Sequence, residues 1–180
     1  GSLNSFVDGP LIRRIRPYDK FLFPIGKSGT PNSLGNNIEI SNTQSGPLLW
    51  SAEYFTPNTT SGAAFITAPL LGVSAQEYYT VKTTAATQAT LNLNWTSNSD
   101  VTPIITGGMS NIRLARYDTG TGKWVEVPTS STGGDSFGTA TSISYVTASA
   151  AGSDNYTLGS ITDLKPRAKF SLTVQVCGTA

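Results

Sequence analysis

The sequence predicts an all-β fold, an antiparallel immunoglobulin-like β-sandwich with an N-terminal β extension. Three observations favour this class. The 180 residues include 18 glycines and 10 prolines, which interrupt the chain every few residues. Helical periodicity is nearly absent, and short runs alternate apolar side chains with Thr, Ser or Asn. Since one face of each strand would be exposed to solvent, two antiparallel sheets packed face to face fit the pattern best.

The individual strands are predicted from the apolar alternations, taken along the chain. They cover residues 38–40, 48–54, 79–81, 91–95, 112–114, 124–127, 143–145 and 170–176. The clearest hairpin has the Gly-containing loop 119–122 between strands that end at Tyr117 and begin at Lys123. The poorly patterned stretch 97–110 is interpreted as a long loop, and the small polar residues of 56–68 as a surface loop or a seam.

The length predicts one domain, a single module over residues 1–180. The seam at 56–68 and a second one at 71–74 leave open a division into two sub-lobes, 1–74 and 75–180. We expect residues 23–26 to begin the sandwich. Cys177 is the single cysteine, so no internal disulfide can form.

Composition narrows the classes of function. The chain has no His, only 13% charged residues, and a net charge of +1. Without His, Ser-His-Asp and Cys-His catalysis are excluded. The small net charge provides no field that would recruit nucleic acid. No apolar run approaches the roughly 20 residues of a membrane span, so we expect no membrane insertion. We predict that the chain is not an enzyme and uses no cofactor and no metal.

Three alternatives involve the charged and amide groups. A glycosidase-like pair of carboxylates would need two acidic side chains to converge across a cleft. The acidic candidates are Glu53, Glu77, Asp100, Glu126 and Asp135. Calcium loops at 98–100 and 152–155 are weaker interpretations than ordinary turns. The basic cluster at 13–16 is predicted to be a solvated strand edge, with polyanion binding as the alternative.

The aromatic residues are the candidate ligand-binding groups. Each of the three tryptophans lies on an alternating strand, where a large side chain usually fills the core. Two adjacent pairs, Tyr54-Phe55 and Tyr78-Tyr79, must each direct one ring outward if they lie in strands. Outward rings could serve as stacking platforms for sugars. The full set of candidates for a sugar site is Tyr54, Tyr78, Tyr79, Trp50, Trp95 and Trp124.

Several phrases in order resemble a known family. They are Phe6-Val7-Asp8-Gly9-Pro10-Leu11, Phe23-Pro24-Ile25-Gly26-Lys27, Ser51-Ala52-Glu53-Tyr54-Phe55, Gln76-Glu77-Tyr78-Tyr79, Ile112-Arg113-Leu114-Ala115-Arg116-Tyr117-Asp118 and Asn155-Tyr156-Thr157-Leu158-Gly159-Ser160. Together they resemble the C-terminal β-sandwich region of large secreted surface proteins of Bacteroidetes, adhesin-like substrates of the type IX secretion system. The chain departs from that pattern after Ser160, where residues 161–180 continue as a strand in place of the linker to a sorting domain.

The resemblance and the composition together imply a non-catalytic structural or adhesive module of a large exported surface protein. It would cap a β-helix or repeat array at the cell surface or in the extracellular space, and residues 6–16 would then be the junction with that preceding array. Its partners would be neighbouring domains of the same chain and an extracellular polysaccharide or surface. The alternative is a carbohydrate-binding module of a secreted polysaccharide-degrading enzyme. An exposed row of aromatic rings would favour the second function, and fully buried tryptophans the first.

Overall fold

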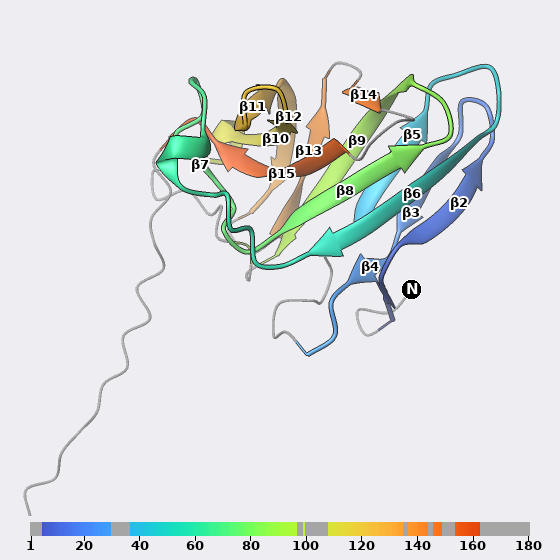
Figure 1. Cartoon of the computed structure of the whole chain (residues 1–180), viewed down its shortest axis with the longest axis horizontal. Coiled ribbons are helices and arrows are strands. Elements are labelled where there is room, and N and C mark those ends of the chain that lie inside the picture. Colours follow the sequence, from blue (N-terminus) through green and yellow to red (C-terminus); the bar gives the residue numbers. More distant parts are fainter. Residues whose placement is uncertain are drawn as a thin grey trace, which may run out of the picture.

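The structure is a computed structural model that describes residues 5–29, 37–96, 99, 108–134, 137–143, 146–148 and 154–162. Two antiparallel sheets pack face to face (Figure 1). Sheet 1 contains β2 (Leu11–Ile15), β6 (Leu48–Phe55), β7 (Gly72–Val73), β8 (Tyr78–Thr83), β10 (Ile112–Asp118), β11 (Lys123–Val127) and β15 (Asp154–Ser160). Sheet 2 contains β3 (Lys20–Phe23), β5 (Ile38–Asn42), β9 (Thr87–Thr96), β12 (Thr129–Gly133), β13 (Phe137–Ser142) and β14 (Val146–Ala148). The predicted all-β antiparallel sandwich is confirmed.

The strand order brings distant parts of the sequence together. Sheet 1 runs β11-β10-β15-β8-β6-β2, and sheet 2 runs β12-β13-β9-β5-β3. Each sheet contains one interrupted strand: β7 and β8 both pair with β15, while β13 and β14 both pair with β9. A short parallel pair, β1 (Val7–Asp8) with β4 (Ile25–Gly26), lies apart from both sheets. Two 3₁₀ turns complete the described elements, η1 (Ala63–Phe65) and η2 (Gly108–Asn111).

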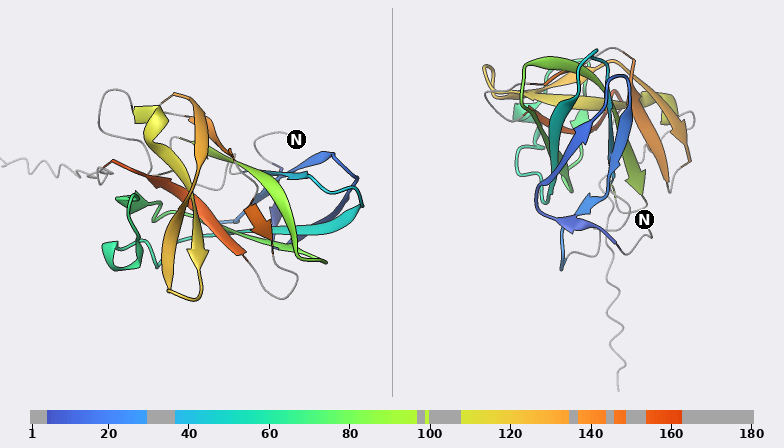
Figure 2. Two further views of the ribbon diagram at one scale, coloured as in Figure 1. Left: turned by 90° about the horizontal axis from the view of Figure 1, so that it is seen from above. Right: turned by 90° about the vertical axis from the view of Figure 1, so that its right-hand side faces the viewer.

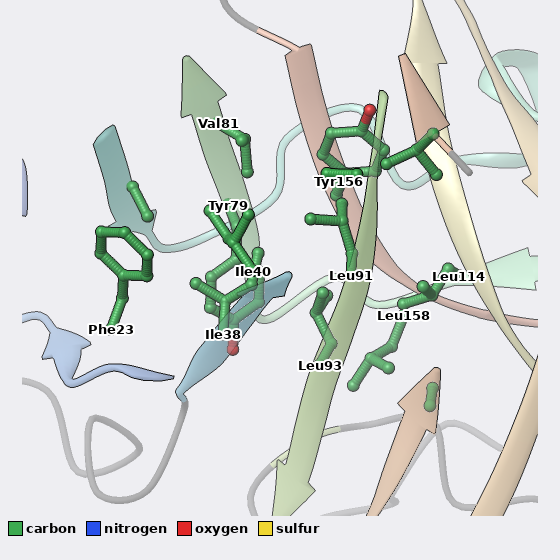
Figure 3. Close-up of a cluster of buried hydrophobic side chains, with 14 of the residues drawn as sticks. Phe23, Ile38, Ile40, Tyr79, Val81, Leu91, Leu93, Leu114, Tyr156 and Leu158 are labelled. Carbon is green, nitrogen blue, oxygen red and sulfur yellow. The ribbon is translucent and has the colours of Figure 1, made fainter. Parts of the chain in front are cut away.

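The core lies between the sheets and follows from strict alternation. In β9, for example, Leu91, Leu93 and Trp95 are buried, and the residues between them are only partly so. Figure 3 shows the cluster that these residues join: Phe23, Ile38, Ile40, Leu91 and Leu93 from sheet 2, with Tyr79, Val81, Leu114, Tyr156 and Leu158 from sheet 1. Each fully buried large side chain contributes roughly 1.5–3 kcal/mol by leaving water. This cluster therefore supplies most of the driving force for folding.

The two sub-lobes considered from the sequence share both sheets. β5 pairs with β9, and β6 pairs with β8, so each sheet contains strands from both sides of residue 74. The sandwich also begins earlier than expected, because β2 lies within the segment interpreted as a junction and pairs with β6 along its length. The N-terminal residues thus extend the sheets instead of standing beside them.

The basic cluster lies where the sequence places it, at a sheet edge. β2 is the last strand of sheet 1, and Arg13 and Arg14 on it are exposed. The guanidinium carbon of Arg13 lies 5.1 Å from the ring centroid of Phe21 on β3, the edge strand of sheet 2. Charged side chains on edge strands oppose pairing with another chain, which accounts for the cluster without a ligand.

The predicted hairpin is confirmed, and three other predicted segments lie wholly or partly outside the described residues. β10 and β11 pair from Leu114↔Val127 to Asp118↔Lys123, and Gly122 has the positive φ of 68° that its turn position requires. Of the strand expected at 143–145, only Ile143 is described, and it is an exposed bend that follows the end of β13 at Ser142. Residues 144–145 lie outside the described residues. Most of the loop expected at 97–110, and all of the strand expected at 170–176, lie outside the described residues.

Candidate functional site

The outer face of sheet 1 carries a second group of buried aromatic and aliphatic side chains. Tyr117 and Trp124 are directly paired across β10 and β11, with ring centroids 5.2 Å apart in an edge-to-face arrangement. Because Trp124 alternates with Val125 along β11, its ring lies on the face away from the core. It packs instead with Leu70, Val73 and Ala115 in a separate small cluster. The outer face is therefore apolar at this end of the sheet.

Residues 56–71, called the covering segment from here on, bury Trp124. Ile66 forms an isolated bridge with Trp124, and the Thr67 amide donates to the Trp124 carbonyl at 3.0 Å. The Trp124 indole Nε1 donates in turn to the carbonyl and hydroxyl oxygens of Thr60, at 3.0 and 3.2 Å. Figure 2 shows this segment in green on the outside of the sandwich, at the end away from β1 and β4. Trp124 is left 1% exposed.

Asn58 fixes the turn that brings the covering segment to the sheet. Its Nδ2 donates to the Ser74 carbonyl at 2.8 Å, and its amide donates to the Ala75 carbonyl at 2.9 Å. Its Oδ1 accepts hydrogen bonds from the amide (3.2 Å) and the hydroxyl (2.9 Å) of Thr60. An Asn side chain that bonds two residues ahead mimics a backbone turn. Asn58 is 3% exposed, so these bonds are protected from water.

A pocket of about 140 Å³ opens between this turn and the outer face of sheet 1. Its aromatic walls are Tyr78, Tyr117 and Trp124, and its polar lining comes from Asn58, Thr59, Thr60 and Asn155. The ring of Phe55 stacks on the ring of Tyr78, with the two centroids 5.0 Å apart and an interplanar angle of 9°. Asn155 lies on β15 opposite Thr80, and its Oδ1 accepts the Thr80 hydroxyl hydrogen at 2.9 Å. The lining combines rings with amide and hydroxyl groups and contains no charged side chain.

The structure separates the sequence candidates into two groups. Tyr78 and Trp124 line the pocket. The other four, Tyr54, Tyr79, Trp50 and Trp95, lie in the sandwich core with at most 2% exposure. Burial raises the pKa of the Tyr79 hydroxyl well above its ordinary value, so this group is un-ionised. Each adjacent aromatic pair does direct one ring outward as expected: Phe55 and Tyr78 outward, Tyr54 and Tyr79 inward.

Sequence reasoning missed five residues of the pocket, namely Asn58, Thr59, Thr60, Tyr117 and Asn155. Tyr117 is the last aromatic in the alternation of β10, and its phase relative to Leu114 places it outward. Asn58 and Asn155 both belong to Asn-x-Thr triplets, a pattern that occurs often in a Thr-rich chain. Asn58 and Asn155 are 97 positions apart in the sequence. They come together through the pairing of β7 and β8 with β15, which the sequence does not reveal.

The described acidic side chains are mostly committed to other contacts. Glu126 pairs with Arg113 at 2.8 Å, and Glu39 pairs with Lys20 at 3.2 Å. Glu77 is fully buried, so its side chain is shielded from solvent. Asp100 and Asp135, and most of the two calcium-loop candidates, lie outside the described residues. Among the residues that the structure describes, no three His, Cys, Asp or Glu side chains cluster to hold a metal ion.

The chain was compared with protein families, with curated proteins and with solved structures. No family model, no curated protein and no solved structure matches this chain. Within the described part of the chain, no helix has the length and apolarity needed to cross a bilayer.

Proposed function

We propose that this chain is a non-catalytic adhesive module that binds carbohydrate in the pocket beside the covering segment. The single observation that carries the proposal is the lining: three aromatic rings around a small cavity with amide and hydroxyl groups between them. Pockets that bind small molecules combine apolar walls with a few placed polar groups. Sugars match this combination, since their C–H faces pack on rings while their hydroxyls form hydrogen bonds.

The support of the pocket favours binding to a preformed site. Tyr78, Tyr117 and Asn155 stand on paired strands, where their backbone positions are fixed by the sheet. Asn58 and Thr60 are held by hydrogen bonds to each other and to Ser74 and Trp124. A ligand would therefore order few side chains on binding, which keeps the entropic cost of association low.

The context proposed for this module is a large exported surface protein. The Thr-, Ser- and Gly-rich composition and the resemblance to Bacteroidetes surface proteins both support an extracellular or cell-surface location. Neighbouring domains of the same chain would carry the sandwich, and the pocket would contact a polysaccharide or glycan. Catalysis has no support at this site, because the pocket lining contains no carboxylate to act as acid, base or nucleophile.

A glycan array with the purified chain, followed by calorimetric titration of any hit, tests the proposal. We expect saturable binding that Tyr78→Ala and Tyr117→Ala each weaken by at least about tenfold, as loss of a principal ring contact does. Phe137→Ala is the matched control, because Phe137 is 71% exposed on sheet 2, on the other side of the sandwich. Binding that survives both tyrosine variants would contradict the assignment of the pocket.

A purely structural spacer is the second candidate. It is favoured by the burial of all three tryptophans, each at most 1% exposed. A spacer would bind no glycan on the array and would lose nothing but stability in the tyrosine variants. The same experiment therefore separates the two functions.

A further inference from the structure

The polar groups of the pocket are unequally available. Both amide oxygens already accept hydrogen bonds: Oδ1 of Asn58 from Thr60, and Oδ1 of Asn155 from the Thr80 hydroxyl. The Nδ2 of Asn58 is likewise engaged, with the Ser74 carbonyl. The Nδ2 of Asn155 forms no hydrogen bond with any described residue. Asn155 Nδ2 is thus the one side-chain amide N–H group of the lining that is left for a ligand. The hydroxyls of Thr59, Tyr78 and Tyr117 can each donate or accept.

The charge of the lining restricts the ligand further. Asn58, Thr59, Thr60, Tyr78, Tyr117, Trp124 and Asn155 are all uncharged. Acidic sugars are usually held by Arg or Lys, whose charge offsets the loss of hydration of a carboxylate. Cationic amino sugars would need a carboxylate for the same reason. A neutral ligand is the one that this lining can desolvate at low cost.

The size of the pocket restricts the ligand to one unit. Its volume of about 140 Å³ lies well below the roughly 300–1,000 Å³ of pockets that enclose larger ligands. The covering segment closes one side, because Thr60 is bonded to the Trp124 indole. A single sugar ring, or the substituent of one ring, is what this space can surround, while the remaining units of a chain would lie outside.

From these observations we infer that the pocket selects a neutral N-acetylated amino sugar, presented as the terminal residue of a glycan. This inference rests on the proposed function and specifies its ligand class. The acetamido group is the part recognised. Its carbonyl oxygen supplies the acceptor that Asn155 Nδ2 lacks, and its methyl group is an apolar surface for the rings of Tyr78, Tyr117 and Trp124. A plain hydroxyl at the same position of the sugar supplies no methyl and a less basic acceptor.

Saturation-transfer NMR and calorimetry with methyl glycosides test the inference. The probes are the methyl glycosides of N-acetylglucosamine and N-acetylgalactosamine, compared with those of glucose and galactose. We expect the N-acetyl sugars to bind at least about tenfold more tightly, because only they offer Asn155 Nδ2 an amide carbonyl together with a methyl group for the rings. The strongest saturation should fall on the acetamido methyl. Equal affinity for sugars with and without the acetamido group would overturn the inference.

Asn155→Asp is the variant that isolates the donor. The carboxylate keeps an acceptor for the Thr80 hydroxyl, removes Nδ2 and retains the shape of the side chain. We expect it to reduce N-acetyl sugar binding by at least about tenfold and to abolish the preference over unacetylated sugars. Asn94→Asp, in the corresponding Asn-x-Thr triplet of β9 on sheet 2, is the control and should bind as the unchanged chain does.

The outcomes distinguish this inference from the function on which it rests. Unacetylated neutral sugars that bind as well as N-acetyl sugars, and are lost in Tyr78→Ala, would overturn the ligand class and leave the carbohydrate site standing. Failure of every sugar to bind would overturn both. Binding of N-acetyl sugars that Asn155→Asp leaves unchanged, with a normal unfolding transition, would overturn the role given to Asn155.

Discussion

The two faces of sheet 1 bury aromatic rings in different ways. On the inner face, Tyr54 and Tyr79 meet edge to face at 5.5 Å within the sandwich core. On the outer face, their neighbours Phe55 and Tyr78 stack in parallel at 5.0 Å and remain partly exposed. Alternation along β6 and β8 sends each adjacent pair to opposite faces. The same local sequence therefore serves the core on one side and the candidate site on the other.

The difference shows what each face depends on. The inner face packs against the whole of sheet 2, so its side chains are part of one cooperative core. One end of the outer face is covered by the covering segment, residues 56–71, which is held through a few hydrogen bonds and a small apolar cluster. Regions with few buried contacts open at lower free energy than the global transition. We infer that inner-face changes act on global stability and outer-face changes act on the pocket.

Replacing a tryptophan on each face gives the largest contrast. Trp50→Ala should lower the free energy of unfolding by about 3–5 kcal/mol, because it removes a fully buried core ring. Trp124→Ala should cost less, since water can enter where the covering segment loosens, but it should abolish ligand binding. Chemical denaturation measures the first effect, and titration the second. Equal destabilisation by the two variants would contradict a division between the faces.

A glycine contact tests how tightly the core is packed. A methyl group on Gly138 would overlap the Trp95 indole, so Gly138→Ala should destabilise by about 1–3 kcal/mol through overpacking. Gly46→Ala is the control, because a Cβ there meets nothing within 4 Å. Both are compared by thermal and denaturant unfolding. A neutral Gly138→Ala would show that the Trp95 ring has room to move.

Two buried asparagines give a smaller, matched comparison. Asn42 Nδ2 bonds the carbonyls of Arg16 (3.0 Å) and Gly46 (2.9 Å), which joins the turns beside β3 and β5. Asn58 performs the same task for the covering segment. Each Asn→Ala change should cost about 1–2 kcal/mol. Hydrogen exchange should show faster exchange at residues 58–75 only in Asn58→Ala, and uniform acceleration there in both would contradict the local assignment.

The sequence predicted the strands whose apolar and polar residues alternate, and the turn whose residue types are typical of a hairpin. The alternation of β5, β6, β8, β9, β10 and β11 and the loop at 119–122 were all apparent from residue types. The assignment of Trp124 was not, because its phase along β11 gives a face but not which face is the core. Trp124 is buried on the outer face because the covering segment packs on it through residues such as Ile66 and Leu70. These few apolar residues lie in a polar stretch without periodicity, so the sequence did not predict the contact.

The edge strand β12 and the parallel pair β1–β4 were not predicted from the sequence, and β2 was predicted only as a charged strand edge at residues 13–16, for a related reason. β2 carries Arg13 and Arg14 between its apolar residues, and β12 is Thr129–Gly133, almost without apolar side chains. Edge strands pack on one side only, so their sequences carry less hydrophobic pattern. β2 pairs with β6, which lies far from it along the chain, and β12 pairs with β13, which follows it.

An ion pair outside both faces provides the smallest predicted effect. Hydrogen bonds from Lys27 and Ser28 lower the pKa of the Asp8 carboxyl from 3.8 to about 2. Since the folded-state pKa is depressed, the stabilisation is complete above about pH 4 and is lost as pH falls toward about 2. Asp8→Asn should remove this dependence without changing ligand binding. Unfolding midpoints measured across that range check it, and identical pH profiles for the two chains would contradict it.

The three indole N–H signals in one nitrogen–proton NMR spectrum test the central claim most directly. Trp50 and Trp95 are core residues, whereas Trp124 lines the pocket with its Nε1 bonded to Thr60. Titration with methyl N-acetylglucosaminide should move the Trp124 signal in a saturable way and leave the other two in place. A Trp124 signal that stays fixed at saturating sugar, or signals that all move together, would contradict a binding site on the outer face.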